Sequence, residues 1–196
     1  MKKLIFATQN GNKVKEVNQL LVGLDYFQVV SLSECGITEE IPETSDTLEG
    51  NARQKARYIF ETYGYDCFSE DTGLEVEILD NAPGVYSARY AGPQKSSRDN
   101  ISKLLLDLEG QTNRNARFRT VICLLLDQKE FLFEGVINGV IAEMECGICG
   151  FGYDPVFIPD GFNITFAQME LNQKNAISHR AQAVTKLTDF LSKQGS

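Results

Sequence analysis

Carboxylates at two places in the chain have the chemistry needed for metal-assisted hydrolysis. Glu70 and Asp71 directly follow the apolar run 67–69, and Glu43 lies in an acidic loop. The run predicts a short buried strand that ends at Glu70, with a turn and then an amphipathic strand over 74–78. Active sites gather at strand ends in α/β proteins, and carboxylates that leave several waters on Mg²⁺ suit phosphate-bearing ligands. The strand-end pair therefore favours a functional role, whereas Glu43 alone would be typical of a solvated surface.

A polar turn near the N-terminus has the residue types of an anion site. The turn over 8–13 follows the apolar segment 3–7, which predicts a buried strand. Apolar residues then recur at helical spacing, so we expect a helix that begins close to Lys13 with unpaired N–H groups facing the turn. Phosphate binds readily at such a helix start. Because the turn lacks the glycine spacing of known phosphate loops, the side chains of Thr8, Asn10 and Lys13 must contribute. The apolar stripe comprises Val14, Val17, Leu20, Leu21 and Leu24.

Two potentially cationic side chains stand at the start of the last expected helix. Ser178 is a good N-cap, and His179 and Arg180 follow it in the first turn. The helix dipole disfavours cations there, so they favour an anionic or carbonyl-bearing ligand, unless both point into water. His179 is the only histidine of the chain and has no acidic neighbour in the sequence. Serine and cysteine nucleophiles therefore lack a partner, which argues against covalent acyl chemistry.

The remaining apolar patterns predict an α/β protein. They indicate a strand over 27–32 and a helix from about Thr47, followed by a helix over 97–109. Two long strands, 116–126 and 131–141, are joined by a hairpin signal at 127–130. No linker or repeat interrupts the pattern, so we expect one domain over 1–196. The inward face of the helix from Thr47 comprises Leu48, Ala52, Ala56, Ile59 and Phe60.

Composition excludes several classes of partner. The 196 residues carry a formal net charge of −8, with 42% hydrophobic and 23% charged residues. Nucleic-acid-binding proteins usually need a basic face, so we expect no nucleic-acid partner. No apolar run suits a signal peptide or a membrane span, which predicts a cytoplasmic protein without a membrane partner. In the reducing cytoplasm we expect the five cysteines to stay thiols. Cys146 and Cys149 have the spacing of a metal or redox pair but lack the further ligands of a zinc site.

Six motifs, in order, resemble the inosine triphosphate pyrophosphatase family, whose members hydrolyse non-standard purine nucleoside triphosphates such as ITP, dITP and XTP. The resemblance runs almost from end to end. Any one motif is weak, and the ordered set is specific. The motifs are ATxNxxK at 7–13, ET and TLxxNAxxKA within 43–56, EDTGL at 70–74, APGVYSARY at 82–90, FGYDP at 151–155 and KNAISHR at 174–180.

The resemblance implies an α/β fold with a long twisted mixed sheet flanked by helices, and two lobes with a central active-site cleft. It also implies a homodimer, a purine nucleoside triphosphate as substrate and Mg²⁺ as cofactor. Asp71 would be the catalytic base, and Glu43, Asp71 and Glu70 would serve the metal. Substrate contacts would come from Thr8, Gln9, Asn10, Gly11, Asn12, Lys13 and Thr72, from Phe151, Gly152, Tyr153, Asp154, Lys174, Ser178, His179 and Arg180, and further phosphate contacts from Lys55 and Arg89.

These roles form a coherent hydrolysis, in which water attacks the α-phosphorus and pyrophosphate leaves. Mg²⁺ and Lys13 would keep Asp71 ionised. Donors that face a six-oxo group would accept hypoxanthine and xanthine and exclude adenine, but would leave the rejection of GTP unexplained. Two alternatives stay open: a Maf-like pyrophosphatase that acts on other nucleotides, and a sensor that binds nucleotide without hydrolysis.

Overall fold

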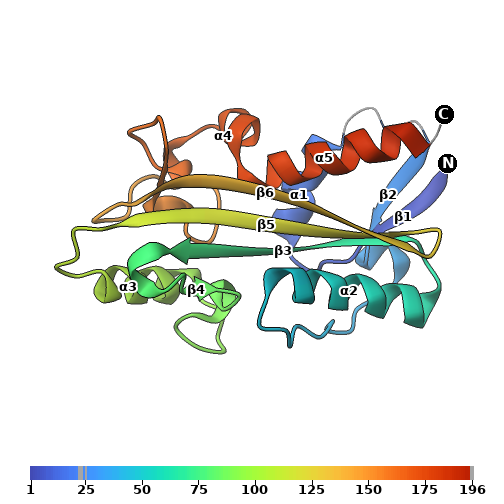
Figure 1. Cartoon of the computed structure of the whole chain (residues 1–196), viewed down its shortest axis with the longest axis horizontal. Coiled ribbons are helices and arrows are strands. Elements are labelled where there is room, and N and C mark those ends of the chain that lie inside the picture. The colour runs from blue at the N-terminus through green and yellow to red at the C-terminus, as the bar shows by residue number, and fades with distance from the viewer. Residues whose placement is uncertain (22–23, 25, 195–196) are drawn as a thin grey trace. The chain divides into compact units, whose positions relative to one another are not determined.

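The computed structural model describes residues 1–21, 24 and 26–194 of the chain. Within them, helices and strands are interspersed along the chain, and two consecutive helices, α4 and α5, close it (Figure 1). The helices are α1 (Gly11–Leu20), α2 (Leu48–Tyr63), α3 (Ser97–Asp107), α4 (Leu171–Ile177) and α5 (His179–Gln194). The strands are β1 (Lys2–Phe6), β2 (Phe27–Ser31), β3 (Cys67–Val76), β4 (Pro83–Gly84), β5 (Asn115–Leu126), β6 (Lys129–Ile141) and β7 (Phe157–Pro159).

The strands form one mixed sheet in the order β2-β1-β3-β5-β6-β7, with β4 paired to β3. β1 runs parallel to β2 and β3, whereas β4 is antiparallel to β3 and β7 is antiparallel to β6. β5 and β6 are joined by Asp127 and Gln128, whose φ angles of 50° and 64° suit a two-residue type I′ hairpin turn. The mixed sheet flanked by helices confirms the predicted α/β class.

Packing divides the chain into two compact units. Unit 1 comprises Met1–Asp71, Thr120–Gly135 and Arg180–Ser196, and unit 2 comprises Thr72–Arg119 and Val136–His179. Strands β3, β5 and β6 contribute residues to both units. The two units agree with the two expected lobes, while the expected central cleft and the single domain over 1–196 stay predictions.

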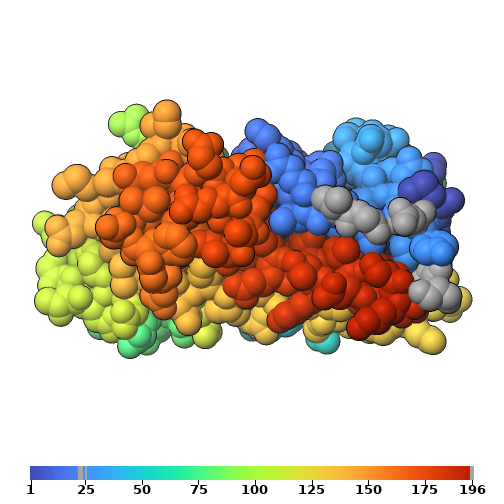
Figure 2. Space-filling model, turned by 90° about the horizontal axis from the view of Figure 1, so that it is seen from above, coloured from blue at the N-terminus to red at the C-terminus, as the bar shows by residue number. Residues whose placement is uncertain are grey.

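Unit 1 has helices on both faces of its strands (Figure 1). On one face, α1 and α5 share a core with the strands that includes Val17, Phe68 and Leu187. On the other face, α2 lies against β3, where the Cys67 thiol donates to the Ala56 carbonyl at 3.1 Å. Figure 2 shows α5, in red, along the surface of this unit beside the N-terminal segment. Each fully buried large apolar side chain contributes about 1.5–3 kcal/mol to such a core.

Unit 2 has a separate apolar core. The ring of Phe118 on β5 lies 4.7 Å from that of Phe157 and 6.2 Å from that of Phe166, measured between centroids. Leu104 and Leu108, from α3 and the residue that caps it, join the same core. The rings adopt the edge and offset arrangements that aromatic pairs favour.

The predicted elements around β3 and α1 differ from the structure, and one helix was missed. β3 continues from Cys67 to Val76, so residues 70–73 are strand and not a turn. This strand lies between β1 and β5, and its polar residues are satisfied by side chains from distant segments, which local composition does not reveal. α1 begins at Gly11 and ends at Leu20, so Leu24 lies beyond it, and residues 22, 23 and 25 of the expected helix lie outside the described residues. Helix α4 was not predicted.

Three helices start close to their predicted positions. Thr47 caps α2 by accepting the Gly50 N–H at 3.0 Å, and Ser96 caps α3. Ser178 directly precedes α5, which places His179 and Arg180 in its first turn as expected. In the part of the chain that the structure describes, no helix combines the length and apolar character that crossing a bilayer requires.

Candidate active site

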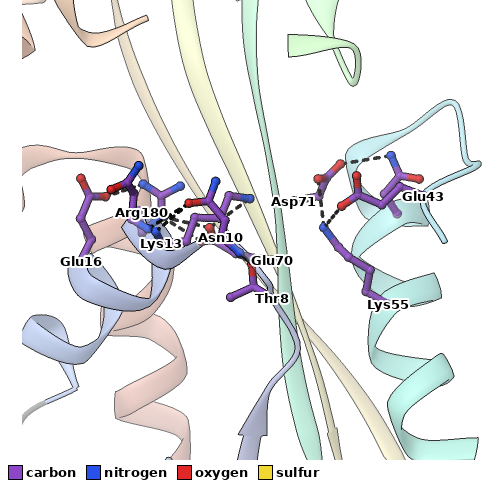
Figure 3. A network of polar contacts seen from close by, with 11 residues as sticks. Thr8, Asn10, Lys13, Glu16, Glu43, Lys55, Glu70, Asp71 and Arg180 are labelled. Carbon is purple, nitrogen blue, oxygen red and sulfur yellow. Dashed lines mark hydrogen bonds and ion pairs between the residues drawn. The ribbon is translucent and has the colours of Figure 1, made fainter. Parts of the chain in front are cut away.

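Strand β3 holds two carboxylates that are adjacent in sequence but face opposite ways. Successive side chains of a strand point to opposite faces of the sheet. Phe68 belongs to the core under α1 and α5, whereas the Ser69 hydroxyl donates to the Ala52 carbonyl of α2. Glu70 therefore shares the face of Phe68, and Asp71 shares that of Ser69. Figure 3 shows the two carboxylates in separate polar groups.

The Asp71 carboxylate has a donor at each oxygen. Lys55 Nζ lies 3.2 Å from Asp71 Oδ1 and 2.5 Å from Glu43 Oε1 (Figure 3). Asn51 Nδ2 donates to Asp71 Oδ2 at 3.2 Å. Asn51 and Lys55 are four residues apart on α2, a spacing that puts both side chains on one face of the helix. Helix α2 therefore fixes the orientation of a carboxylate on β3.

Lys55 is a buried cation between two carboxylates. Its side chain is only 6% exposed. Burial by itself would lower the pKa of Lys55, but the charges of Asp71 and Glu43 outweigh that effect and raise the pKa. Lys55 therefore stays charged, and one negative charge remains on the Glu43–Asp71 pair for a second cation to neutralise.

The donor chemistry of Glu43 and Asp71 fits Mg²⁺. Their carboxylates already converge on one cation, the Lys55 ammonium, and the Glu43 side chain is 36% exposed, so water reaches the group. Among the described residues, no three His, Cys, Asp or Glu side chains are arranged to hold a metal ion by themselves. Mg²⁺ commonly takes only one or two carboxylates together with waters and substrate phosphates. The pair is therefore sufficient when a phosphate ligand provides further oxygens.

On the opposite face of β3, Glu70 lies in a buried ion-pair network. Arg180 Nε lies 3.1 and 2.9 Å from the two Glu70 oxygens, and Arg180 Nη1 lies 2.5 Å from Glu16 Oε2. Burial would raise the pKa of Glu70, but the charges of Arg180 and Lys13 lower it to about 2. Burial would likewise lower the pKa of Arg180, but Glu70 and Glu16 raise it. These ion pairs tie α1, β3 and α5 together.

Lys13 is the member of this network that is nearest to solvent. Its Nζ lies 3.2 Å from Glu70 Oε1, and its side chain is 13% exposed. Burial is the main cause that lowers the pKa of Lys13, and the charges of Lys55 and Arg180 lower it further against the opposing effect of Glu70. An anionic ligand beside Lys13 would offset both causes and favour its charged form.

The predicted anion turn is partly capped by its own side chains. Asn10 Oδ1 accepts the N–H groups of Asn12 at 3.0 Å and Lys13 at 3.3 Å. Thr8 Oγ1 accepts the Asn10 N–H at 3.2 Å. The expectation of unpaired N–H groups at the start of α1 is therefore wrong for these two positions. A ligand at this helix start would replace or share the Asn10 contacts.

Six further predicted residues are placed by the structure, three in unit 1 and three in unit 2. The Gln9 amide donates to two backbone carbonyls of the acidic loop over 38–39, at 3.1 and 2.5 Å. Gly11 and Asn12 are the exposed first residues of α1. Thr72 lies in β3 within unit 2, and the Arg89 guanidinium lies 5.2 Å from the centroid of the Tyr86 ring. Gly152 has a φ of 61°, in the left-handed region.

A second polar group lies in unit 2, around a buried ion pair. Lys174 Nζ is 2.7 Å from Asp154 Oδ2, and the same oxygen accepts the Phe151 N–H at 2.8 Å. The Lys174 ammonium also lies 5.2 Å from the centroid of the Phe151 ring. The ion pair is almost fully buried, with 3% and 4% of the two side chains exposed. An aromatic face beside a cation suits a flat ligand with a polar edge.

Three neighbours of this group are buried as well. The Tyr153 hydroxyl donates to the Ser87 carbonyl at 2.9 Å, and burial raises the pKa of Tyr153. The His179 ring stacks on Phe118 with centroids 4.7 Å apart and planes at 16°. Ser178 is 1% exposed. These contacts fix the walls of the polar group around Lys174.

Within unit 1, four of the predicted residues have other partners than the sequence suggested. Lys55, not Lys13, is the cation that contacts Asp71. Glu70 is not brought to Glu43 and Asp71, and instead contacts Lys13 and Arg180 on the other face of β3. Arg180, which was predicted as a substrate contact, pairs with Glu70 and Glu16. Two residues without a predicted site role also contribute: Asn51 contacts Asp71, and Glu16 contacts Arg180. The sequence indicates them only through helical spacing, Asn51 from Lys55 and Glu16 from Lys13.

Comparisons with known proteins agree over the full length. The chain matches a sequence model of the Ham1 family over residues 4–190. A protein of Flavobacterium psychrophilum named dITP/XTP pyrophosphatase is 51% identical over 188 residues, which are 96% of this chain and 98% of the relative. A protein of Porphyromonas gingivalis with the same name is 53% identical over 192 residues, 97% of this chain and 98% of the relative.

Solved structures agree as well. The Ham1 protein of Staphylococcus aureus matches with a TM-score of 0.89 at 36% identity, over 98% of this chain and 100% of that chain. A HAM1 protein of Coxiella burnetii matches with a TM-score of 0.91 at 35% identity, with the same coverage. Sequence and fold therefore place this chain in the Ham1 family.

Proposed function

We propose that this protein hydrolyses non-standard purine nucleoside triphosphates, namely dITP, XTP and ITP, to the nucleoside monophosphate and pyrophosphate. The observation that carries the proposal is the geometry at Asp71, whose carboxylate is held by Lys55 and Asn51 next to Glu43. The names of relatives that are more than 50% identical support the choice of substrate. Hydrolysis of such triphosphates removes them from the nucleotide pool.

The polyphosphate would bind at the turn that precedes α1. Thr8, Asn10 and Lys13 supply a hydroxyl, an amide and an ammonium at a helix start, which is the chemistry that phosphate oxygens require. Glu70 and Arg180 do not need to touch the substrate in this arrangement. Their buried ion pair holds Lys13 at the protein surface, because Glu70 contacts both cations.

Mg²⁺ would be held by Glu43 and Asp71, with the substrate phosphates as further ligands. When bound, the metal supplies positive charge that stabilises the phosphate oxygens. Lys55 contributes a second positive charge to the same group. Glu70 is left out of the proposed metal ligands because its oxygens are engaged by Arg180 and Lys13.

Asp71 would act as the general base. A water molecule attacks the α-phosphorus, its proton passes to an Asp71 oxygen, and the bond from the α-phosphorus to the bridging oxygen of pyrophosphate breaks. Lys55 and Asn51 hold this carboxylate in place because each donates to one of its oxygens. Pyrophosphate takes the electron pair of the broken bond and leaves.

The purine would bind at the polar group of unit 2. Phe151 offers a ring face for stacking, and Lys174 offers a cation to the six-oxo group of hypoxanthine or xanthine. Adenine would present an amino donor to this cation, and two donors cannot hydrogen-bond to each other, which disfavours ATP. Arg89 would be a further phosphate contact.

We also propose that the protein is a cytoplasmic homodimer and that it has no nucleic-acid or membrane partner. The net charge of −8 supports the first exclusion, because a polyanion would be repelled. Sedimentation at several protein concentrations tests the dimer. A species with the mass of one chain at all concentrations would contradict it.

The function is tested by measuring pyrophosphate release from dITP, XTP, ITP, GTP, ATP and dTTP, with Mg²⁺ and with a chelator. We expect fast release from the first three nucleotides, with the monophosphates as products, and no release in chelator. Release from dTTP alone would indicate a Maf-like pyrophosphatase. Binding of the nucleotides without any release would indicate a sensor.

A further inference from the structure

Asn51 joins two parts of the candidate site that are distant in the sequence. Its side chain donates from Nδ2 to Asp71 Oδ2 at 3.2 Å, and its Oδ1 accepts the Ser45 N–H at 2.9 Å. Asn51 is 1% exposed, so both contacts are made away from solvent. Ser45 lies two residues after Glu43, on the loop that brings this glutamate to Lys55. One amide therefore connects β3 with the Glu43 loop.

We propose that Asn51 is a positioning residue for hydrolysis, which fixes the orientation of the Asp71 carboxylate relative to the Glu43 loop. This inference rests on the proposed function. With Lys55 at Oδ1 and Asn51 at Oδ2, the Asp71 carboxylate has a partner on each side that opposes rotation about its bond to Cβ. A base must hold its oxygen in line with the attacking water, and a displacement of about 1 Å can cost about 100-fold in rate.

A second residue of α2, Gln54, also binds the Glu43 loop and allows an experiment to distinguish positioning of Asp71 from attachment of the loop. Gln54 Oε1 accepts the Thr44 N–H at 2.9 Å, and Gln54 Nε2 donates to Thr44 Oγ1 at 3.0 Å. Gln54 thus attaches the same loop to α2, one residue closer to Glu43. Its hydrogen bonds go to Thr44, whereas Asn51 also bonds Asp71. Gln54→Ala is therefore a matched control for loss of loop attachment.

Two variants remove the proposed contact in different ways. Asn51→Asp keeps an acceptor for the Ser45 N–H but replaces the donor to Asp71 with a carboxylate that repels it. Asn51→Ala removes both contacts. We expect kcat for dITP to fall about 100-fold in Asn51→Asp and about 10-fold in Asn51→Ala, with KM within about 3-fold of wild type in each. We expect Gln54→Ala to keep kcat within about 3-fold, because a contact near the surface contributes little.

The experiment measures kcat and KM for the four proteins together with their melting temperatures and their affinity for dITP in chelator by titration calorimetry. The inference predicts that kcat falls without a matching loss of dITP affinity, and that it falls only in the Asn51 variants. Equal losses in Asn51→Ala and Gln54→Ala, a kcat that follows the melting temperature, or unchanged kcat in both Asn51 variants would overturn it. If Asn51→Asp does not fold, Asn51→Ala decides the question. An inactive wild type would instead overturn the proposed function, and this inference with it.

Discussion

Glu70 and Asp71 are consecutive residues of β3, but Glu70 contacts Arg180 whereas Asp71 contacts Lys55, on the other face of the strand. The two networks draw on different helices, with α1 and α5 on the Glu70 side and α2 on the Asp71 side. Substitutions at the two positions should therefore have separable effects. Changes at Glu70 should act mainly on stability, and changes at Asp71 should act mainly on turnover.

Asp71→Asn should abolish most turnover and spare nucleotide binding. The amide cannot accept the proton of the attacking water, and general bases typically contribute about 10²–10⁴-fold to rate. We expect kcat for XTP to fall within that range, while the dissociation constant of XTP in chelator stays within about 3-fold of wild type. Asp46→Asn makes the same chemical change at an exposed position of the Glu43 loop and is the control. Equal turnover by wild type and Asp71→Asn would exclude Asp71 as the base.

Glu70→Gln should lower the free energy of unfolding in a pH-dependent way. The pKa of Glu70 is lowered from its ordinary value of 4.5 to about 2 in the folded protein. Its charge therefore stabilises the folded state above about pH 4.5, and this contribution is lost as the pH falls toward 2. The difference in pKa corresponds to roughly 3 kcal/mol.

Urea unfolding of wild type and Glu70→Gln at several pH values between 7 and 3 measures this contribution. We expect the difference in unfolding free energy between the two proteins to be largest at neutral pH and to shrink below about pH 4.5. A difference that stays constant over this range would show that the charge of Glu70 is not what stabilises the fold.

Gly150→Ala should weaken nucleotide binding through Asp154. A Cβ at position 150 would collide with Asp154 Oδ2, the oxygen that accepts from Lys174, and the φ of +75° is strained for alanine. Gly161→Ala has a similar φ of +83° but no atom within 4 Å of its Cβ, so it isolates the backbone strain. We expect KM for XTP to rise about 10-fold in Gly150→Ala only, since a hydrogen bond to a charged group is worth about 1.5–3 kcal/mol. Similar KM values in both variants would show that the Asp154–Lys174 pair does not bind the substrate.

The sequence pattern predicted those elements that are specified by residues close to one another in the sequence. The start of α2 near Thr47 and the hairpin of β5 and β6 follow from residues within a few positions of one another. The interior of β3 could not be predicted in this way, because the polar run 70–73 has the composition of a turn. It is a strand because partners far away in the sequence satisfy it: Arg180 is 110 residues from Glu70.

The same reason limited the prediction of the candidate site. The motifs located the residues, but the partners of Glu70 and Asp71 depend on the face of β3 to which each side chain points. Because 70–73 were expected to form a turn, the alternation of faces along this segment could not be predicted. The ion pair of Arg180 with Glu16 spans 164 residues. Asn51 carried a weaker signal, its four-residue spacing from Lys55 on α2.

The central claim is that water attacks the α-phosphorus of a non-standard purine nucleoside triphosphate. Single-turnover hydrolysis of XTP in water labelled with oxygen-18, followed by mass spectrometry of both products, tests it most directly. We predict one labelled oxygen in xanthosine monophosphate and none in pyrophosphate. Label in pyrophosphate, or orthophosphate as the released product, would contradict the account.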